Sequence, residues 1–272
     1  MLTGRTIKRG FDIKSKIKRV SRVIKKTRGL TPSDKTPASL LSSNKVTGYS
    51  LNFPIAGTCL PSKLCVETCY YAAGASSWDA SLRKQMWLLD ECRADPISFA
   101  KRVVKEYRKK RLTFLRWNGG GDLFPEAVES INHIGSVYPD VVLWIVTRNV
   151  DLAPTVADHP NLHLHFSLDQ YSLDRGAKVR PQMSRPIFFS YQCAKGEKPD
   201  IHRLAEEHHI SLFFFDNYVL TDTRYVDDDY RRYICPLNYN RTSTGDITGS
   251  CGQCRKCFDG HWLRTAHDET SI

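Results

Sequence analysis

Short apolar runs alternate with stretches of helical periodicity along most of the chain. Apolar or alternating runs of roughly four to eight residues predict strands. They cover residues 49–55, 112–117, 141–147, 162–168, 186–191 and 211–215. Apolar positions three and four apart predict helices at residues 76–93, 96–110, 125–137, 152–158 and 199–209. Because strands alternating with helices need crossover connections, we expect an α/β fold with a parallel sheet, in the form of a partial (β/α)6 TIM-like barrel.

Polar and glycine residues gather directly after the first three predicted strands. In parallel α/β sheets, ligands bind at the carboxyl ends of the strands, on the loops that follow. The residues at these positions are Cys59, Cys65 and Cys69, then Asn118, Gly119, Gly120, Gly121 and Asp122, then Thr147, Arg148 and Asn149. The sequence therefore predicts a site at this edge of the sheet.

The fourth predicted strand alternates between an apolar and a polar face. Its polar face carries His163, His165, Ser167 and Asp169. A polar face on a buried strand needs a ligand, a hydrogen-bonded network or water to satisfy it, and the sequence leaves these open.

The basic charge of the chain is concentrated near its start. The formal net charge is +11; residues 1–45 hold thirteen Lys and Arg against two Asp, and the remaining residues hold 27 of each sign. Ile13, Ile17, Val20 and Ile24 recur at helical spacing, which predicts a basic amphipathic helix. Such a helix could bind nucleic acid, contact another anionic surface or partner, or pack on the body of the protein. Residues 30–43, with several Pro, Ser and Thr, are typical of a linker.

The composition is that of a globular protein, with 41% hydrophobic and 25% charged residues. The longest apolar run, residues 141–146, is far too short to cross a bilayer, so we expect no membrane span. The start of the chain lacks the apolar segment of a secretory signal, and the expected compartment is the cytoplasm. Since cytosolic thiols stay reduced, the nine cysteines favour metal ligation or catalysis over disulfides.

Cys59, Cys65 and Cys69 form an incomplete set of three metal ligands. A structural site normally has four protein ligands, whereas three leave one position open for water or substrate. On a four-iron cluster, the open iron would suit the amine and carboxylate of a methionine.

Four further cysteines predict a closed metal site near the end of the chain. Cys251, Cys254 and Cys257 lie in the run SCGQCRKC, and Cys235 precedes Pro236. Four thiolates suit either an auxiliary four-iron cluster or a structural zinc.

Together these motifs resemble the radical S-adenosylmethionine (SAM) superfamily. The resemblance rests on the three-cysteine loop, on Tyr70 directly after it, on the glycine run with Asp122, and on Ser167 with Asp169. The sequence looks most similar to a phage-encoded branch that combines a Cys-Tyr loop end, an Arg-x-x-x-x-Gly-Asp segment (residues 116–122) and a Thr-Arg-Asn strand end (residues 147–149). The resemblance covers roughly residues 48–260. The cysteine spacing of five and three intervening residues departs from the superfamily's commonest pattern of three and two.

The resemblance implies a role for each matched residue. Cys59, Cys65 and Cys69 would ligate the four-iron cluster that binds SAM. The glycines would let the backbone approach the methionyl amine, and Tyr70 would contact the adenine. The full set implied to bind the cofactor is Tyr70, Asn118, Gly119, Gly120, Gly121, Asp122, Thr147, Ser167 and Asp169.

The resemblance also implies an activity. A radical SAM enzyme takes an electron from an external donor of the flavodoxin or ferredoxin type, cleaves SAM reductively to a 5′-deoxyadenosyl radical, and abstracts hydrogen from a substrate. A nucleic acid or nucleotide is one candidate substrate, through the basic N-terminal arm. Two alternatives stay open: a non-catalytic zinc or iron-sulfur nucleic-acid-binding protein, and a family member without radical chemistry.

We divide the chain into a basic arm and linker (1–45), a radical SAM-like partial barrel (46–218) and a cysteine-rich extension (219–272).

Overall fold

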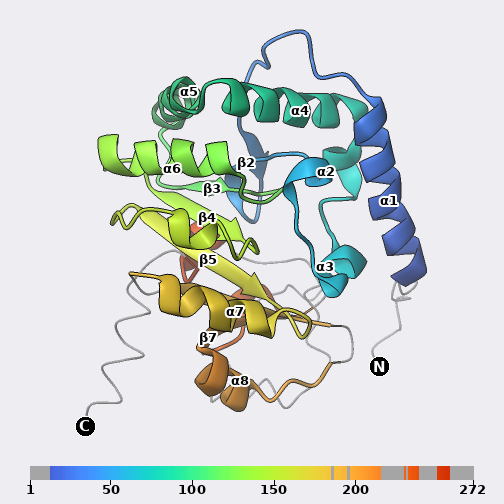
Figure 1. The fold of residues 1–272 in the computed structure, drawn as a ribbon, viewed down its shortest axis with the longest axis vertical. Helices are drawn as coiled ribbons and strands as arrows, with labels where there is room; N and C mark the ends of the chain where they lie inside the picture. The colour runs from blue at the N-terminus through green and yellow to red at the C-terminus, as the bar shows by residue number, and fades with distance from the viewer. Residues whose placement is uncertain are drawn as a thin grey trace, which may run out of the picture.

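A seven-stranded sheet forms the centre of the computed structural model, which describes residues 13–184, 187–194, 197–215, 230, 232–238 and 250–257 (Figure 1). Its strands follow chain order across the sheet: β1 (Ser42–Asn44), β2 (Gly48–Leu51), β3 (Leu115–Trp117), β4 (Leu143–Thr147), β5 (Leu162–Leu168), β6 (Phe188–Cys193) and β7 (Ile210–Phe215). β1 and β2 pair antiparallel, and β2 to β7 pair parallel. The prediction of an α/β fold with a parallel sheet is confirmed. The sheet is open, with β1 and β7 at its edges.

Most predicted helices are present, and three unpredicted ones occur between the strands. The α-helices are α1 (Ile13–Gly29), α2 (Ile55–Thr58), α3 (Lys63–Thr68), α4 (Asp79–Ala94), α5 (Pro96–Lys109), α6 (Pro125–Val137), α7 (Leu173–Val179), α8 (Ile201–His208) and α10 (Cys251–Cys254). Short 3-10 turns occupy Gly74–Ser77, Ala153–Thr155, Arg180–Gln182 and Pro236–Asn238. The helix expected at residues 152–158 is only the second of these turns, because the backbone becomes extended at Val156.

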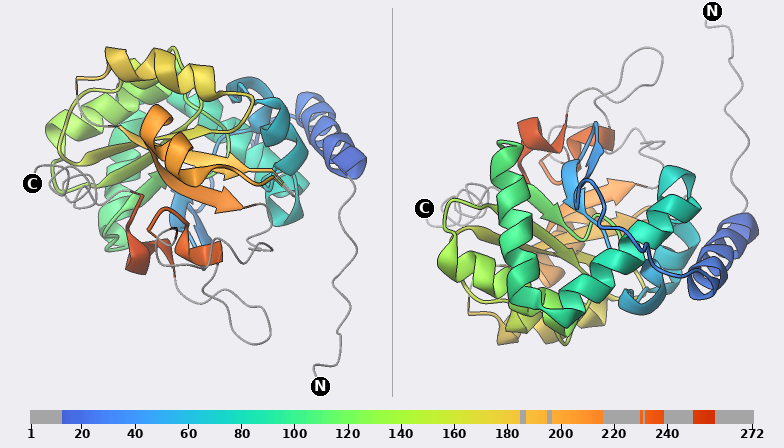
Figure 2. Two further views of the ribbon diagram at one scale, coloured as in Figure 1. Left: turned by 90° about the horizontal axis from the view of Figure 1, so that it is seen from below. Right: turned by 90° about the horizontal axis from the view of Figure 1, so that it is seen from above.

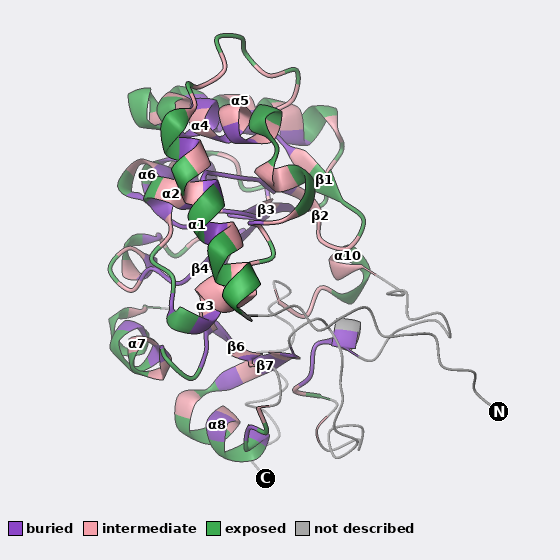
Figure 3. Cartoon of the chain, turned by 90° about the vertical axis from the view of Figure 1, so that its right-hand side faces the viewer, coloured by how far each residue is buried: buried purple, intermediate pink, exposed green. Residues whose placement is uncertain are grey.

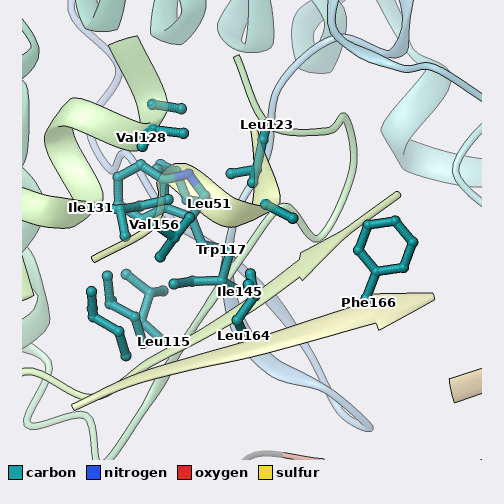
Figure 4. Packing of buried hydrophobic residues seen from close by; sticks show 14 of the residues in the cluster. Leu51, Leu115, Trp117, Leu123, Val128, Ile131, Ile145, Val156, Leu164 and Phe166 are labelled. Atoms are coloured by element: carbon teal, nitrogen blue, oxygen red, sulfur yellow. The ribbon is translucent and has the colours of Figure 1, made fainter. Parts of the chain in front are cut away.

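One face of the sheet is covered by helices and contains the main core. Strand residues such as Leu115, Trp117, Ile145 and Phe166 are fully buried there, against residues of α4 to α8 (Figure 4). Figure 4 shows Val128 and Ile131 of α6 lying over these strand side chains. The apolar half of each strand's alternation is thus used on the helical side.

The alternate strand residues point to the other face. They include Ser50, Arg116, Trp144, His165 and Ser190, which line a cavity instead of the helical core. In Figure 2 the helices lie on one side of the sheet, while α10 and residues 232–238 lie on the other, beside the β1–β2 hairpin. Of the polar face predicted for this strand, His165 and Ser167 of β5 border the cavity.

The segment predicted as a linker is partly built into the fold. Leu40 and Leu41 are buried in the main core, and β1 begins at Ser42, so the linker ends earlier than residue 43. Burial of these apolar side chains lowers the free energy of the folded state, and this fixes the end of the segment to the sheet.

Helix α1 packs on the body of the protein. Val20 and Val23 are buried against Ile55, Ala72 and Leu82, which belong to the segment around the first cysteine group. Of the three roles considered for the basic helix, packing on the body of the protein is therefore observed. This packing leaves the outer face of α1 exposed (Figure 3). Among the described residues, no helix is long and apolar enough to cross a membrane.

Candidate functional site

A cavity of roughly 1320 Å³ lies on the face of the sheet opposite the main core. Cys69, Tyr70, Tyr71 and Gly119 contribute to its wall from the loops that follow β2 and β3. All four predicted C-terminal cysteine ligands contribute to the wall as well: Cys235, Cys251, Cys254 and Cys257. Cys69 of the first cysteine group and all four cysteines of the second group therefore border one cavity.

The first cysteine group is built around the short helix α3. Ser62 caps this helix, because its hydroxyl accepts a hydrogen bond from the backbone N–H of Cys65 at 3.1 Å. Cys65 lies within the helix, and Cys69 follows its last residue, Thr68. The position of α3 therefore sets the position of two of the three thiols.

A buried network holds α3 at both of its ends. At its start, the Ser62 hydroxyl donates to the carboxylate of Asp169, just after β5. At its end, the Thr68 hydroxyl accepts from Gln192 Nε2 of β6 at 2.6 Å. Arg148, just after β4, joins the two: Nη1 donates to Asp169 Oδ2 at 2.6 Å, and Nη2 donates to Gln192 Oε1 at 2.9 Å. The Asp169 side chain is fully buried and that of Arg148 is 10% exposed, so water screens this ion pair little.

The glycine run after β3 allows other parts of the chain to approach closely. A Cβ at Gly120 would lie 2.3 Å from the ring of Tyr71, and one at Gly121, where φ is +83°, would lie 2.8 Å from Thr58 Oγ1. A Cβ at Gly119 would lie 2.3 Å from Asn52 Oδ1. Of the three, only Gly119 lines the cavity. Gly120 and Gly121 thus make room for the cysteine segment itself.

Asp122 ties the glycine run to the end of β4. Thr147 Oγ1 donates to its carboxylate at 2.6 Å, and the backbone N–H of Arg148 donates at 3.2 Å. Its own N–H donates to Thr58 Oγ1 at 3.2 Å, next to Cys59. Burial raises the pKa of Asp122 to about 6, although these hydrogen bonds act in the opposite direction. Asp122 and Thr147 therefore hold the loops together instead of lining the cavity.

The three thiols of the first group are neighbours in an environment that disfavours free thiolates. Burial raises the pKa of Cys59 well above its ordinary value, and the charges of Asp122, Cys65 and Cys69 add to the shift. Burial also raises the pKa of Cys65, while Arg148 acts in the opposite direction. Buried thiolates need a compensating positive charge, which a metal centre would provide.

Cys59, Cys65 and Cys69 are the residues of the first group that could hold a metal centre. In the described part of the chain, no three His, Cys, Asp or Glu side chains converge as ligands of one metal ion do. Asn52 Oδ1 is also buried with no hydrogen-bond partner in the described structure, and Asn52 lines the cavity. A buried acceptor of this kind calls for a donor from a ligand.

The remaining predicted cofactor residues fall into two groups. Tyr70 lines the cavity, and its hydroxyl donates to the carbonyl of Gly119 at 2.5 Å. Ser167 lines the cavity from β5. Asn118, with a φ of +63°, is buried and donates to the carbonyl of Val146, and Asp169 belongs to the buried network. Ser167 and Tyr70 can therefore reach a ligand, whereas Asn118 and Asp169 are bound within the protein.

The second cysteine group lies between the two edges of the sheet. Residues 232–238 run along β7, where the N–H of Cys235 donates to the carbonyl of Phe213 at 3.0 Å. At the other edge, the N–H of Cys251 donates to the carbonyl of Val46, in the β1–β2 turn, at 2.7 Å. Burial raises the pKa of Cys257 well above its ordinary value, and Cys235, Cys251 and Cys254 add to the shift. The four predicted ligands are therefore neighbours.

Two cavity residues to which the sequence assigned no role, Arg116 and His165, lie between the cysteine groups. Arg116 Nη2 donates to the Tyr70 hydroxyl at 3.2 Å, and its guanidinium lies 4.8 Å from the ring centre of Trp144. His165 Nδ1 accepts from Trp144 Nε1 at 3.1 Å, so the ring proton is on Nε2, which donates to Ser190 Oγ at 2.6 Å. Burial, with Arg116 and Arg148 nearby, lowers the pKa of His165 to about 3. The sequence had placed His165 on the polar face of its strand and Arg116 at the start of the Arg-x-x-x-x-Gly-Asp segment, but long-range contacts were needed to show their places in the cavity.

The fold and the site together define an α/β protein with an open, mostly parallel sheet and a cavity bordered by two groups of cysteines. Residues 19–260 match the model of the family described as GP88, Gene product 88. The match covers most of the chain, and the protein belongs to this family. Comparisons with curated proteins and with solved structures found no match.

Replacing Asp169 with Asn should destabilise the protein strongly. Asn keeps the size of the side chain but leaves the Arg148 charge buried without its counterion, which costs about 3 to 5 kcal/mol. The free energy of unfolding is measured with urea. The control is Asp140→Asn, which removes the carboxylate of an exposed ion pair with Arg108 and should leave the unfolding midpoint near wild type. Equal effects of the two substitutions would contradict the role of the network.

Replacing His165 with Gln should change the pH dependence of stability. The folded protein keeps His165 neutral, because its pKa is about 3, whereas the unfolded chain takes up a proton below about pH 6.5. The wild type therefore loses stability as the pH falls through this window. Between pH 7 and pH 5 it should lose about 2 kcal/mol more than the variant.

The matched control for this test is Ser190→Ala. It removes the hydrogen-bond partner of His165 but keeps the imidazole, so its stability should run parallel to that of the wild type over the same pH range. Parallel curves for His165→Gln and the wild type would show that the imidazole is not held neutral.

Proposed function

We propose that the chain is an iron-sulfur enzyme of the radical SAM type. The observation that carries the proposal is the incomplete set of three neighbouring thiols after the carboxyl end of β2, of which Cys69 lines a large cavity. The helix that contains Cys65 and directly precedes Cys69 is held at both ends by a buried network. Such rigid support is expected where a reactive group must be positioned accurately.

Cys59, Cys65 and Cys69 would hold the cluster. With SAM bound to its open iron, and with one electron from a donor of the flavodoxin or ferredoxin type, a four-iron cluster supplies a 5′-deoxyadenosyl radical that abstracts hydrogen from a substrate. The contribution of the chain is to bind and orient SAM and the substrate and to exclude water from the site. Arg148 lies near Cys65 and would offset the negative charge of the thiolates.

The cavity wall next to the thiols offers groups for the SAM molecule. Asn52 Oδ1 is a buried acceptor beside Gly119, suited to the methionyl ammonium. Tyr70 is fixed by its hydrogen bonds with Gly119 and Arg116, and its ring can pack on the adenine. Ser167 can donate to a carboxylate or a ribose hydroxyl. Asp122, Thr147, Asn118 and Asp169 would then act by positioning the loops.

The sheet is proposed to be a partial (β/α)6 barrel. Its six parallel strands, β2 to β7, carry helices on one face and the cavity on the other, as the interior of a barrel would. The sheet is open between β1 and β7. This opening leaves more space inside than the packed interior of a closed eight-stranded barrel.

The second cysteine group is proposed to bind an auxiliary four-iron cluster or zinc through Cys235, Cys251, Cys254 and Cys257. Because Cys235 is bonded to β7 and Cys251 to the β1–β2 turn, a metal centre there would link the two open edges of the sheet. A closed four-thiolate site suits this structural role, or electron transfer, better than substrate activation.

The competing function is a non-catalytic metal-containing nucleic-acid-binding protein, which the basic surface of α1 favours. A family member that has lost radical chemistry is a second competitor. Both predict bound metal without formation of 5′-deoxyadenosine. Product analysis of the reduced, anaerobically purified protein with SAM therefore separates them from the proposed enzyme.

Replacing Cys65 with Ala should abolish the formation of 5′-deoxyadenosine. The substitution removes one of the three proposed ligands of the first cluster and leaves the second group intact. The variant should therefore keep roughly the amount of metal that the second site binds in the wild type. Iron, sulfide and zinc counts, with chromatography of the SAM products, measure both effects. The control is Cys92→Ala, at a buried cysteine that contacts Ser130 and lies outside both groups. Undiminished cleavage by the Cys65 variant would contradict the ligand assignment.

Replacing Cys257 with Ala should loosen both edges of the sheet. Loss of the second metal centre frees Cys235 and Cys251 from their common link, so amide hydrogen exchange should speed up in β2 and β7 together. The Cys65→Ala variant should instead speed up exchange in α3. Loss of the second metal with unchanged exchange at both edges would contradict a linking role.

A further inference from the structure

Helix α1 carries a continuous stripe of positive charge on its exposed face. Lys14, Lys18, Arg22, Lys25 and Arg28 are all exposed, and at 100° per residue they fall within one third of the helix circumference. We call these five residues the basic stripe. The helix contains no acidic residue. Lys18, Arg22, Lys25 and Arg28 form no ion pair within the described structure.

The basic stripe is long enough to contact several successive phosphates of a nucleic-acid strand. From Lys14 to Arg28 it runs about 21 Å along the helix axis. Neighbouring phosphates of one stacked strand lie about 3.4 Å apart along the axis, so the stripe matches roughly six phosphates. A single nucleotide has far too few phosphates to use it.

The same helix leads to the cavity. Arg19 and Lys16 line the cavity, and at 100° per residue they lie about 60° and 120° around the helix from Arg22, so positive charge continues from the stripe around the helix to the cavity. Val20 and Val23 fix the helix against Ile55, Ala72 and Leu82. A strand that lies on the stripe therefore reaches the cavity by passing Arg19 and Lys16.

All the Lys, Arg, Asp and Glu residues in the described cavity wall are basic. They are Lys16, Arg19, Lys84, Arg116, Arg255 and Lys256. A wall with cations and no carboxylates, within the described residues, attracts an anionic ligand and disfavours a cationic one.

The cavity also offers groups that suit a nucleobase. Tyr70, Tyr71, Trp144 and Phe214 contribute aromatic rings, on which bases stack. Gln85 lines the cavity and has a buried Oε1 with no hydrogen-bond partner in the described structure. Amide side chains of this kind recognise the polar edges of bases. At roughly 1320 Å³ the cavity exceeds the usual range of about 300 to 1000 Å³ for one small ligand, so it can hold SAM and a nucleotide together.

We propose that the substrate is single-stranded nucleic acid, whose backbone lies along the basic stripe and which inserts one nucleotide into the cavity. This inference rests on the proposed function, since it names the substrate of the same site. A duplex would have to release the base from its stack before the base could enter the cavity, whereas a single strand has less stacking to lose.

The first test measures binding of labelled 20-nucleotide single strands, DNA and RNA, to the full-length chain by fluorescence anisotropy at several salt concentrations. The variant Lys18→Gln, Arg22→Gln, Lys25→Gln removes three charges of the basic stripe. The matched control is Lys101→Gln, Lys105→Gln, Lys109→Gln, which removes three exposed charges at similar spacing from α5, on the helical face of the sheet.

The stripe variant should bind on the order of a hundredfold more weakly at 0.1 M salt, and the slope of log affinity against log salt should fall by about 2. The α5 variant should bind like the wild type. Equal binding by the two variants, or binding without salt dependence, would overturn the proposal. Competition by free mononucleotides, or by vesicles of phosphatidylcholine and phosphatidylserine, as effective as competition by the strand would overturn it as well.

The second test locates the inserted nucleotide. A strand containing 5-iodouracil should photocross-link to Tyr70, Tyr71, Trp144 or Phe214, as mapped by mass spectrometry. Cross-links confined to other parts of the protein would overturn insertion into the cavity. Strand binding without formation of 5′-deoxyadenosine would refute the radical enzyme alone, whereas 5′-deoxyadenosine without strand binding would refute the substrate alone.

Discussion

The buried ion pair between Arg148 and Asp169 is the constraint on which the candidate site depends. It connects the ends of β4 and β5, and through Ser62 and Gln192 it reaches both ends of the helix that carries Cys65. A buried ion pair seldom adds stability compared with a well-packed apolar pair, but it fixes geometry, because each charge must meet its partner. In this protein the ion pair connects the carboxyl edge of the sheet to a six-residue helix that carries Cys65 and buries only Leu64.

The two cysteine groups give the two sides of the cavity different properties. The first group has three thiols, one of them on a helix held by the buried network, while the second has four and is hydrogen-bonded to both edges of the sheet. Arg116 lies between them, because it contacts Tyr70 on one side and offsets the charge of Cys251 and Cys257 on the other. One cationic side chain thus interacts electrostatically with the second cysteine group and contacts Tyr70 beside the first group.

Local patterns predicted the main elements well, and long-range contacts account for what they missed. The predicted and observed bounds of α6 coincide, and those of α5 differ by one residue, because Pro begins both helices and, in α5, Asp95 caps the first turn. The six-residue helix α3 is too short for helical periodicity to be recognised, and its partners are distant, since Ser62 and Asp169 are 107 residues apart. For the same reason the sequence could not indicate that Asp169 bonds to Ser62 and Arg148, or that Gly120 faces the ring of Tyr71. The spacing of the cysteines defined both groups, and the structure brings the thiols of each group near one another. That these thiols ligate a metal stays a prediction.

The proposed open coordination position on the first cluster can be tested spectroscopically. Electron paramagnetic resonance of the anaerobically reconstituted, reduced full-length chain, recorded before and after addition of SAM, reports on the electronic environment of the cluster irons. Binding of the methionyl group to an open iron should shift the signal in the wild type, and the shift should be absent when the first group is removed by replacing Cys59, Cys65 and Cys69 with Ala. A wild-type cluster signal that stays unchanged at saturating SAM would contradict the proposal that the first centre binds and activates this cofactor.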